Sequence, residues 1–443
     1  MPALNTDLYE LTMAAGYFMS GKAHDVATFE LSIRRLPDHR NFLIAAGLQQ
    51  ALEYLRELRF EQDELDYLRS LKQFANTPPE FFDYLGKLRF EGDVFAVPEG
   101  TPVFGGEPLL IVRAPLIQAQ LVETYLLSTI AFQTTIASKA VRCVMAAGGR
   151  SIVEFGSRRA HSPGAGPLAG RAAYLAGCAG TSNAEAGMRF GIPVFGTAAH
   201  SWTTAFADEE QSFRQLQKLL GEETVYLVDT YDAIEGTRLA ARLGRPLWGV
   251  RLDSGDLAAQ GREVRRILDE GGLESAHIMA TNDLNEKKIA DLLASGAPID
   301  AFGVGTELAT SADAPSLSAV YKMVELQVGE SHSYTAKYSP DKVTLPGAKQ
   351  IYRYAGYDLL TLYNECNQEF QGEPLLHPVL AKGELLERYP ALADVRRRTA
   401  KAVAALPSEL LSLDRTTVYR VDVSERLQLL ADSVRTSRQM VTL

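Results

Sequence analysis

The segment GIPVFGTAAHSW, residues 191–202, contains a histidine whose surroundings suit chemistry better than packing. The apolar run from Ile192 to Phe195 predicts a strand covered on both faces, and Gly196 ends it. Thr197 and His200 follow at its carboxyl end, with two small residues between them. An imidazole at this place can act as a nucleophile or a base if a partner fixes its tautomer. The alternative is a histidine with a purely structural role.

Asp229 is a carboxylate that could be the partner of His200, and it follows another short run with β-branched residues. Asp229 comes directly after the predicted strand 224–228, where it could accept a hydrogen bond from one imidazole nitrogen. The other nitrogen would then stay exposed as the reactive atom. The alternative is that Asp229 caps the helix that begins near Tyr231, a common task for aspartate.

The segment GVRLDSGDL places a cation and a carboxylate two residues apart on an extended stretch. Arg251 and Asp253 can therefore point to the same side, and together they suit an anionic substrate that also carries hydroxyl groups. The alternative is a buried Arg-Asp pair, with Ser254 or Asp256 capping the next helix.

Two glycine-containing segments have the composition of phosphate sites. FGVGTEL supplies Gly303, Gly305 and Thr306, and glycines let backbone N–H groups approach phosphate oxygens closely. GSRRAHSPGAG adds Arg158 and Arg159. A tight turn and a mobile surface loop are the respective alternatives. The chain has no GxxxxGK[ST], GxGxxG or HExxH motif, so standard motifs predict neither ATP nor zinc binding.

The elements that must position these residues alternate between short strands and helices. Because polar residues end almost every strand, a closed α/β barrel with its site at the carboxyl ends is favoured over an open doubly wound sheet. The predicted strands are 151–155, 176–178, 192–195, 224–228, 248–250, 278–280 and 299–302, and the predicted helices are 203–220, 233–243, 257–270 and 285–294.

The 443 residues exceed one barrel of the usual size, so a second domain must flank it. Short strands and Pro-Gly turns before and after the barrel predict an α/β sandwich formed from both flanks. We expect its N-terminal part over 1–114, the catalytic barrel over 115–335 and the completing segment over 336–443.

Composition narrows the class of protein. A formal net charge of −10 weighs against a nucleic-acid or anionic-membrane binder. Three widely spaced cysteines, Cys143, Cys178 and Cys366, give neither a disulfide framework nor a zinc pattern. With no signal-peptide pattern and no apolar run of membrane-spanning length, a cytoplasmic protein is expected.

Eight motifs taken in order resemble the nicotinate phosphoribosyltransferase family, which is of the type II phosphoribosyltransferases. The similarity extends over nearly the whole chain. The motifs are TDLYELTMAAGYF, EFGSRRAH, GTAAHSW, LVDTYD, GVRLDSGDL, FGVGTEL, PSLSAVYKMVE and DKVTLPGAKQIYR.

The resemblance implies an irregular α/β barrel with a second α/β domain, in a homodimer whose active sites are shared. It also implies an enzyme of ligase-class glycosyltransferase chemistry in the salvage route to NAD. The expected substrates are nicotinate and 5-phosphoribosyl 1-diphosphate, with ATP as co-substrate and Mg²⁺ as cofactor. The expected products are nicotinate mononucleotide and diphosphate.

The same resemblance assigns roles to the residues. His200 would carry a phosphate from ATP and Asp229 would orient it, while Asp253 would stabilise the reacting sugar. Phe155 would stack on the pyridine ring opposite Tyr9 of the partner subunit. Thr197 and Arg251 would lie near nicotinate, and the phosphoribosyl and diphosphate groups would meet Arg158, Asp253, Gly303, Gly305 and Thr306. Five further residues could line the site or the subunit boundary: Asn282, Asp283, Lys322, Lys337 and Lys349.

Ser182 bears on the choice of substrate. Nicotinamide-specific relatives carry an aspartate at this place, and a carboxylate there would repel nicotinate, so serine favours the acid. The alternatives are a nicotinamide- or quinolinate-type enzyme, a different phosphate-binding barrel such as an aldolase, and a non-catalytic homologue. No lysine ends a predicted strand for Schiff-base chemistry, and the expected histidine, aspartates and arginine are all present.

Overall fold

The computed structural model describes residues 3–338, 343–365 and 370–441, and the chain forms two compact units. The first unit contains 1–134, 316–391 and 402–443, and the second contains 135–315 and 392–401. Cys366 and the first residues of the DKVTLPGAKQIYR motif lie outside the described residues.

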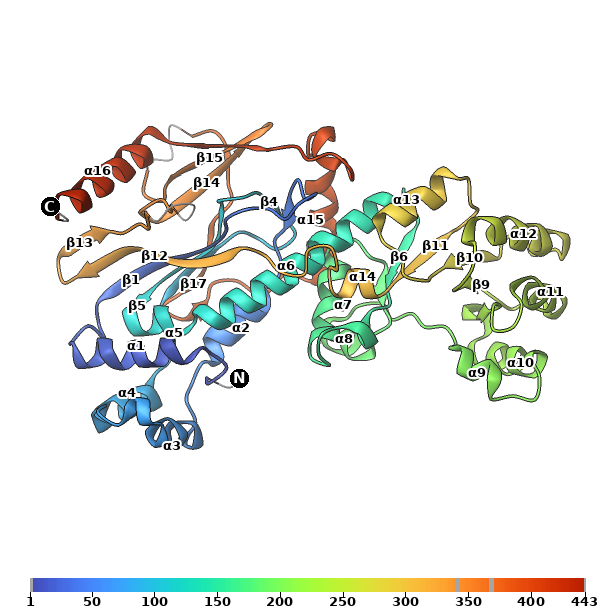
Figure 1. The fold of residues 1–443 in the computed structure, drawn as a ribbon, viewed down its shortest axis with the longest axis horizontal. Helices are drawn as coiled ribbons and strands as arrows, with labels where there is room; N and C mark the ends of the chain where they lie inside the picture. The colour runs from blue at the N-terminus through green and yellow to red at the C-terminus, as the bar shows by residue number, and fades with distance from the viewer. Residues whose placement is uncertain (1–2, 339–342, 366–369, 442–443) are drawn as a thin grey trace. The chain divides into compact units, whose positions relative to one another are not determined.

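The first unit is built on a seven-stranded sheet in the order β13-β12-β1-β5-β3-β17-β18. Its strand β1 (Val26–Ile33) is largely buried and pairs antiparallel with β12 (Ala319–Val328) on one side and with β5 (Pro108–Pro115) on the other. Figure 1 shows the blue β1 beside the orange β12. Segments from both flanks of the chain therefore share one sheet.

The other strands of the first unit are β2 (Leu43–Ile44), β3 (Asp93–Ala96), β4 (Pro102–Val103), β13 (Ser331–Tyr334), β14 (Lys349–Tyr354), β15 (Tyr357–Leu362), β16 (Glu373–Pro374), β17 (His377–Ala381), β18 (Glu384–Leu385) and β19 (Arg420–Val423). Its helices are α1 (Leu8–Met19), α2 (Leu48–Glu57), α3 (Gln62–Ser70), α4 (Pro79–Lys87), α5 (Leu116–Leu121) and α16 (Glu425–Val441). The unit boundaries fall within α6 (Glu123–Ala146), between α14 (Thr306–Ala309) and β12 at 315–316, and at the start of and within α15 (Leu392–Ala404).

These bounds differ from the predicted limits of 1–114, 115–335 and 336–443. The predicted barrel end at 335 includes β12 and β13, yet β12 pairs along its length with β1 in the sheet of the first unit. Pairing between distant segments decides the boundary, and the local pattern of the sequence does not reveal it.

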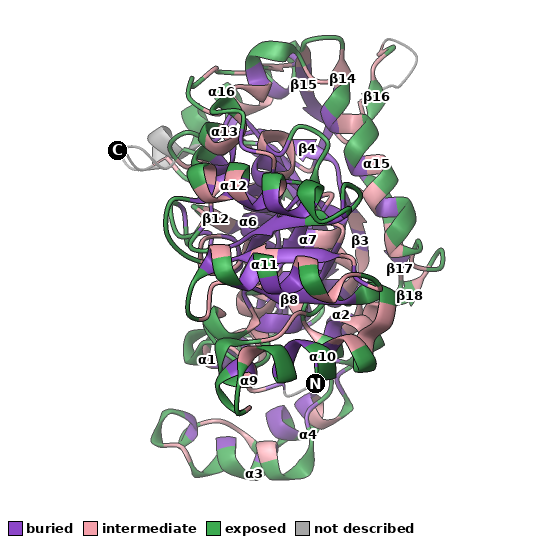
Figure 2. Ribbon diagram, turned by 90° about the vertical axis from the view of Figure 1, so that its right-hand side faces the viewer, coloured by how far each residue is buried: buried purple, intermediate pink, exposed green. Residues whose placement is uncertain are grey.

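The second unit contains a six-stranded parallel sheet in the order β7-β6-β11-β10-β9-β8. Figure 2 shows β8 as buried and many exposed residues on the helices α10, α11 and α12. The strands are β6 (Ser151–Glu154), β7 (Gly180–Thr181), β8 (Val225–Leu227), β9 (Gly249–Leu252), β10 (His277–Ala280) and β11 (Ala301–Val304). The helices are α7 (Ala165–Leu175), α8 (Ala184–Phe190), α9 (His200–Thr204), α10 (Glu209–Leu220), α11 (Ala233–Leu243), α12 (Leu257–Glu270), α13 (Glu286–Ala294) and α14 (Thr306–Ala309).

Two predicted elements, α11 and α12, recur with the same bounds, most of the others are shifted by one or two residues, and three differ in kind. The run 192–195 forms only a bridge between Val194 and Thr181, and Val194 and Phe195 are 49% and 40% exposed, so it is not covered on both faces. Residues 176–178 follow the end of α7, and the strand lies at 180–181. The predicted helix 203–220 is two helices, because Asp208 caps a new one by accepting from Gln211 N.

No helix in the described part of the chain has the length and apolar character needed to cross a membrane.

Candidate active site

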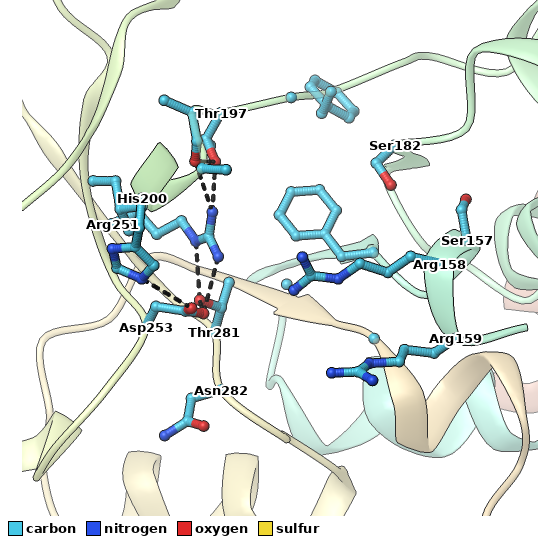
Figure 3. Close-up of a pocket in the computed structure, with 18 of the residues that line it drawn as sticks. Ser157, Arg158, Arg159, Ser182, Thr197, His200, Arg251, Asp253, Thr281 and Asn282 are labelled. Atoms are coloured by element: carbon cyan, nitrogen blue, oxygen red, sulfur yellow. Dashed lines mark hydrogen bonds and ion pairs between the residues drawn. The ribbon is translucent and has the colours of Figure 1, made fainter. Parts of the chain in front are cut away.

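A cavity of about 580 Å³ lies at the carboxyl ends of the parallel strands of the second unit (Figure 3). Ten of the predicted site residues line it: Phe155, Arg158, Ser182, Thr197, His200, Arg251, Asp253, Gly303, Gly305 and Thr306. The expected gathering of strand ends is therefore present. Asp229 and Tyr9 are not among the lining residues.

The guanidinium of Arg251 is bound on three sides. Its Nε donates to Thr281 Oγ1 at 3.0 Å, Nη1 donates to Thr197 Oγ1 at 2.8 Å, and Nη2 pairs with Asp253 Oδ1 at 2.9 Å. Thr281 also donates a short hydrogen bond to the same Asp253 oxygen. The Arg-Asp pair that sequence left as an alternative thus exists, and it faces the cavity rather than a closed core.

The carboxylate of Asp253 is kept ionised. Partial burial acts to raise its pKa, but the hydrogen bond from Thr281, the charge and hydrogen bond of Arg251, and the nearby His200 together lower the pKa below its ordinary value. The side chain is 25% exposed. A fixed negative charge is therefore presented to the cavity.

His200 begins helix α9 and presents both ring nitrogens to defined partners. Its Nδ1 lies 3.2 Å from Thr230 Oγ1, and its Nε2 lies 3.7 Å from Asp253 Oδ2. Figure 3 shows the ring directed toward Asp253. With 46% of the side chain exposed, the imidazole remains accessible from the cavity.

Asp229 has a different partner from the one that its sequence position predicted. Its Oδ2 accepts from the backbone N–H of Asp253 at 2.9 Å and from Ser254 Oγ at 2.6 Å. The hydroxyl of Thr230, one residue later, is the group that lies within hydrogen-bond distance of His200 Nδ1. The predicted direct hydrogen bond from His200 to Asp229 is therefore corrected, because the carboxylate is engaged by the turn that carries Asp253. Nor does Asp229 cap a helix, since Asp232 caps α11.

The predicted phosphate-binding residues lie together across the cavity. Arg158 lies in the 3₁₀ turn Ser157–Arg159, and Gly305 precedes the short helix α14. A Cβ on Gly303 would approach a ring carbon of Phe155 to 2.6 Å, so glycine is required where that ring packs on the strand. The neighbouring Arg159 also lines the cavity.

A buried carboxylate ties the loops that carry Phe155 and Ser182. Glu154 accepts from Thr181 Oγ1 at 2.6 Å and, by a short hydrogen bond, from the backbone N–H of Gly156. The exposed Ser182 donates its own N–H to the Glu154 carbonyl at 2.9 Å. These contacts join the ends of β6 and β7.

Helix α14 is held from beneath by a buried lysine. Lys139, on α6, places its Nζ 2.6 Å from Glu286 Oε2, 2.9 Å from Asp313 Oδ1 and 3.6 Å from Glu307 Oε2. Its side chain is 2% exposed. Because Glu307 belongs to α14, the cluster fixes the helix that begins at Thr306.

The remaining sequence candidates divide between the units. Asn282 and Asp283 line the cavity, both with positive φ, of 89° and 46°. Tyr9 lies on α1 in the first unit and is 45% exposed. Lys349 is buried in the first unit, with Nζ 2.8 Å from Glu30 Oε2, which makes it part of that core.

Lys322 and Lys337 also lie in the first unit. Nζ of Lys322 donates to the Tyr321 carbonyl, and burial lowers the pKa of that amine.

Sequence reasoning missed two hydroxyl residues. Thr281 contacts both Arg251 and Asp253, and Thr230 contacts His200, yet neither residue was predicted to belong to the site. The signal for Thr281 was available, because it directly follows a predicted strand as the other site residues do. Which of the residues 229 and 230 faces the histidine depends on the conformation of the turn, and the sequence does not reveal that conformation.

Comparison with known proteins gives one consistent answer. Family models match residues 4–131, the nicotinate phosphoribosyltransferase N-terminal domain, residues 150–339, the nicotinate phosphoribosyltransferase family, and residues 363–431, the corresponding C-terminal domain.

Individual relatives match over nearly their whole length. The nicotinate phosphoribosyltransferase pncB2 of Mycobacterium tuberculosis is 44% identical, covering 96% of this chain and 92% of the relative. The nicotinate phosphoribosyltransferase of Homo sapiens is 33% identical, covering 97% and 96%. The crystal structure of human nicotinic acid phosphoribosyltransferase superposes with a TM-score of 0.84 at 30% identity, covering 97% of this chain and 99% of that one. The chain therefore belongs to the nicotinate phosphoribosyltransferase family.

Proposed function

We propose that this chain joins nicotinate to 5-phosphoribosyl 1-diphosphate, giving nicotinate mononucleotide and diphosphate, in the salvage route to NAD. The observation that carries the proposal is a single cavity in which the ionised Asp253, held by Arg251 and Thr281, faces the glycine-containing end of β11 and the 157–159 turn. The names of the relatives agree with this activity.

The residues divide the chemistry between the sugar and its leaving group. Loss of diphosphate from the anomeric carbon develops positive charge on the ribose, and the fixed carboxylate of Asp253 stabilises that charge. Arg158 and Arg159, with the backbone N–H groups near Thr306, receive the departing diphosphate. Nicotinate, through its ring nitrogen, forms the new bond to the same carbon.

Recognition of nicotinate follows from the neighbouring loops. The Phe155 ring, given room by Gly303, offers a face on which the pyridine can stack. Ser182 adds a neutral hydroxyl, which does not repel the nicotinate carboxylate. We assign Thr197 and Arg251 to the nicotinate end of the cavity, with Tyr9 of the partner subunit closing over the ring.

ATP is proposed as co-substrate, with His200 as the phosphate acceptor. The half-exposed imidazole faces the cavity beside small residues, which leaves room for nucleotide phosphates. Magnesium fits this donor set, since Mg²⁺ takes one or two carboxylates together with substrate phosphates, and Asp253 and Asp283 both line the cavity. When bound, the ion would neutralise phosphate charge. In the described residues no cluster of three or more His, Cys, Asp or Glu side chains forms a metal cage of its own.

Three further features complete the proposal. The parallel sheet closes into an irregular barrel, with the segment at Val194 as its extra edge next to β7. The chain acts as a cytoplasmic homodimer with shared sites. Asp229 serves as a support for the turn that carries Asp253.

The deciding experiment measures mononucleotide formation from nicotinate and from nicotinamide, each with and without ATP. We expect product from nicotinate, with ATP hydrolysed and the rate or yield raised by ATP. Product from nicotinamide alone would overturn the substrate assignment. A nicotinate reaction indifferent to ATP, or unaffected ATP hydrolysis in His200→Ala, would overturn the phosphate-acceptor role while leaving the transferase intact.

A further inference from the structure

Two consecutive residues after β8, Asp229 and Thr230, contact different parts of the site. Asp229 turns to the loop after β9 and accepts from Asp253 N and Ser254 Oγ, at 2.9 and 2.6 Å. Thr230 turns the other way, and its Oγ1 lies 3.2 Å from His200 Nδ1. Residues 229 and 230 therefore contact both members of the pair His200 and Asp253, whose Nε2 and Oδ2 lie 3.7 Å apart.

A hydroxyl differs from a carboxylate as a partner for imidazole. An ionised carboxylate only accepts hydrogen bonds, so it retains a proton on the nitrogen that it contacts. A threonine hydroxyl can accept from a protonated Nδ1 or donate to an unprotonated one. It can therefore keep the ring in place through a change of protonation at Nδ1.

We propose that Thr230 is the positioning residue of His200, holding Nδ1 so that Nε2 is the ring nitrogen that reacts in the cavity. The proposal rests on the proposed role of His200 as phosphate acceptor. It also gives Asp229 a separate task, the support of Asp253. The nearest charged group to the ring is Asp253, which Arg251 neutralises in part through its ion pair.

The phosphoryl step then has a defined proton balance. In the reactive form Nδ1 carries the proton and donates to Thr230, and the Nε2 lone pair attacks the terminal phosphorus of ATP. The Nε2–P bond forms while the bond from phosphorus to the ADP oxygen breaks, and ADP leaves with that electron pair. The ring is then cationic, and it becomes neutral by releasing the Nδ1 proton to solvent, after which the Thr230 hydroxyl reorients to donate.

Nuclear magnetic resonance of the full chain tests the contact without any substrate. The protein has seven histidines, so ¹⁵N-histidine labelling gives few ring signals, and those lost in His200→Gln identify His200. We expect Thr230→Val to change the proportion of the two neutral tautomers of His200 and Thr230→Ser to preserve it. An unchanged His200 spectrum in Thr230→Val overturns the proposal, as does a change confined to Asp229→Asn.

Phosphate incorporation from γ-labelled ATP gives the second readout. Because a small misplacement of a reacting group can cost about 100-fold in rate, we expect Thr230→Val to slow incorporation by up to about that factor. The KM for ATP should change little, and Thr230→Ser should recover most of the rate. Equal losses in both variants would show that a hydroxyl at this position does not restore the rate, and would overturn the positioning role. If the native chain incorporates no phosphate, the ATP step of the proposed function fails, and the resonance result still decides the role of Thr230.

Discussion

Thr281 shows how one buried hydroxyl can govern a charged site. It accepts from Arg251 Nε while donating to Asp253 Oδ1, so the cation and the carboxylate share one neutral intermediary. Thr281 is 4% exposed. The sequence pattern located most of this site, because polar residues after buried strands were a sufficient signal for the cavity lining. It did not resolve which polar groups contact one another, because those contacts depend on backbone turns after each strand.

Replacing Thr281 by valine removes the hydroxyl at nearly constant volume. An unsatisfied buried polar partner costs about 1–3 kcal/mol, and the loss of the hydrogen bond should raise the pKa of Asp253 toward its ordinary value. We therefore expect lower stability, together with an acidic limb of the kcat/KM profile that moves to higher pH. Thr281→Ser is the matched control, because it keeps the hydroxyl. An unmoved acidic limb in the valine variant would contradict this account of Asp253.

Substrate preference can be examined at Ser182. An aspartate there would place a negative charge beside the nicotinate carboxylate, and like charges brought together cost several kcal/mol. We expect Ser182→Asp to lower kcat/KM for nicotinate by at least about 100-fold and to favour nicotinamide relatively. Ser182→Ala, which adds no charge, should have a much smaller effect. Equal losses in the two variants would show that charge is not the cause.

At the scale of elements, the helix patterns were informative and the strand patterns less so. The bounds of α11 and α12 matched because amphipathic periodicity and the capping residues Asp232 and Asp256 are local signals. The run 192–195 is as apolar as the strands of the parallel sheet, yet it lies at the edge of that sheet and is joined to it by a single bridge in the described residues. Its degree of burial depends on what pairs with that edge, and composition does not encode the partner.

The Lys139 cluster gives helix α14 its anchor, and it can be tested as a unit. Removing one partner of a buried ion pair costs about 3–5 kcal/mol, so Lys139→Met should destabilise the chain strongly. It should also raise the KM for 5-phosphoribosyl 1-diphosphate, because α14 follows the proposed phosphate loop. Lys218→Met, on the partly exposed α10, is the control. Thermal unfolding and steady-state kinetics measure both effects, and full stability in Lys139→Met would refute the anchoring role.

Helix α1 is attached to the start of α6 through the buried Glu10. Its carboxyl accepts from the backbone N–H of Thr124 at 3.0 Å and from the hydroxyls of Thr124 and Thr6. Burial raises its pKa to about 7, despite the opposing effect of these hydrogen bonds. The folded chain therefore keeps this proton more tightly than the unfolded chain, whose value is near 4.5.

The sign of the resulting pH dependence follows from that difference. Stability falls as pH rises from about 4.5 to about 7 and is constant above it, with a total loss of roughly 3 kcal/mol. Glu10→Gln should therefore gain stability relative to the native chain at pH 8 more than at pH 5. Glu222→Gln, at an exposed site, should show no such difference. Unfolding midpoints at the two pH values provide the measurement, and a parallel response of the two variants would contradict it.

At the scale of the whole molecule, the sequence predicts two parts, but it does not reveal the residues at which each part begins and ends. The chain is longer than one barrel needs, and the flanking strand-and-turn patterns predicted a domain assembled from both ends. The limits depend on β12, whose sequence is compatible with either unit and whose pairing with β1 assigns it to the first. Long-range pairing of this kind leaves no periodic trace in a single sequence.

The pairing of β1 with β12 also orders events during synthesis. Val26 is paired with Gln327, so β1 leaves the ribosome long before β12 is made, and the edge of β1 that pairs with β12 stays open until then. All strands of the parallel sheet, by contrast, lie between 151 and 304 and can pair before β12 is made. The parallel sheet is thus free to form first, before residues 392–401 complete the second unit. In the meantime the nascent first unit carries an open strand edge, which is a site of aggregation and chaperone binding. Proteolysis of a chain that ends at residue 315 should yield a protected parallel sheet, β6 to β11, and a cleavable β1.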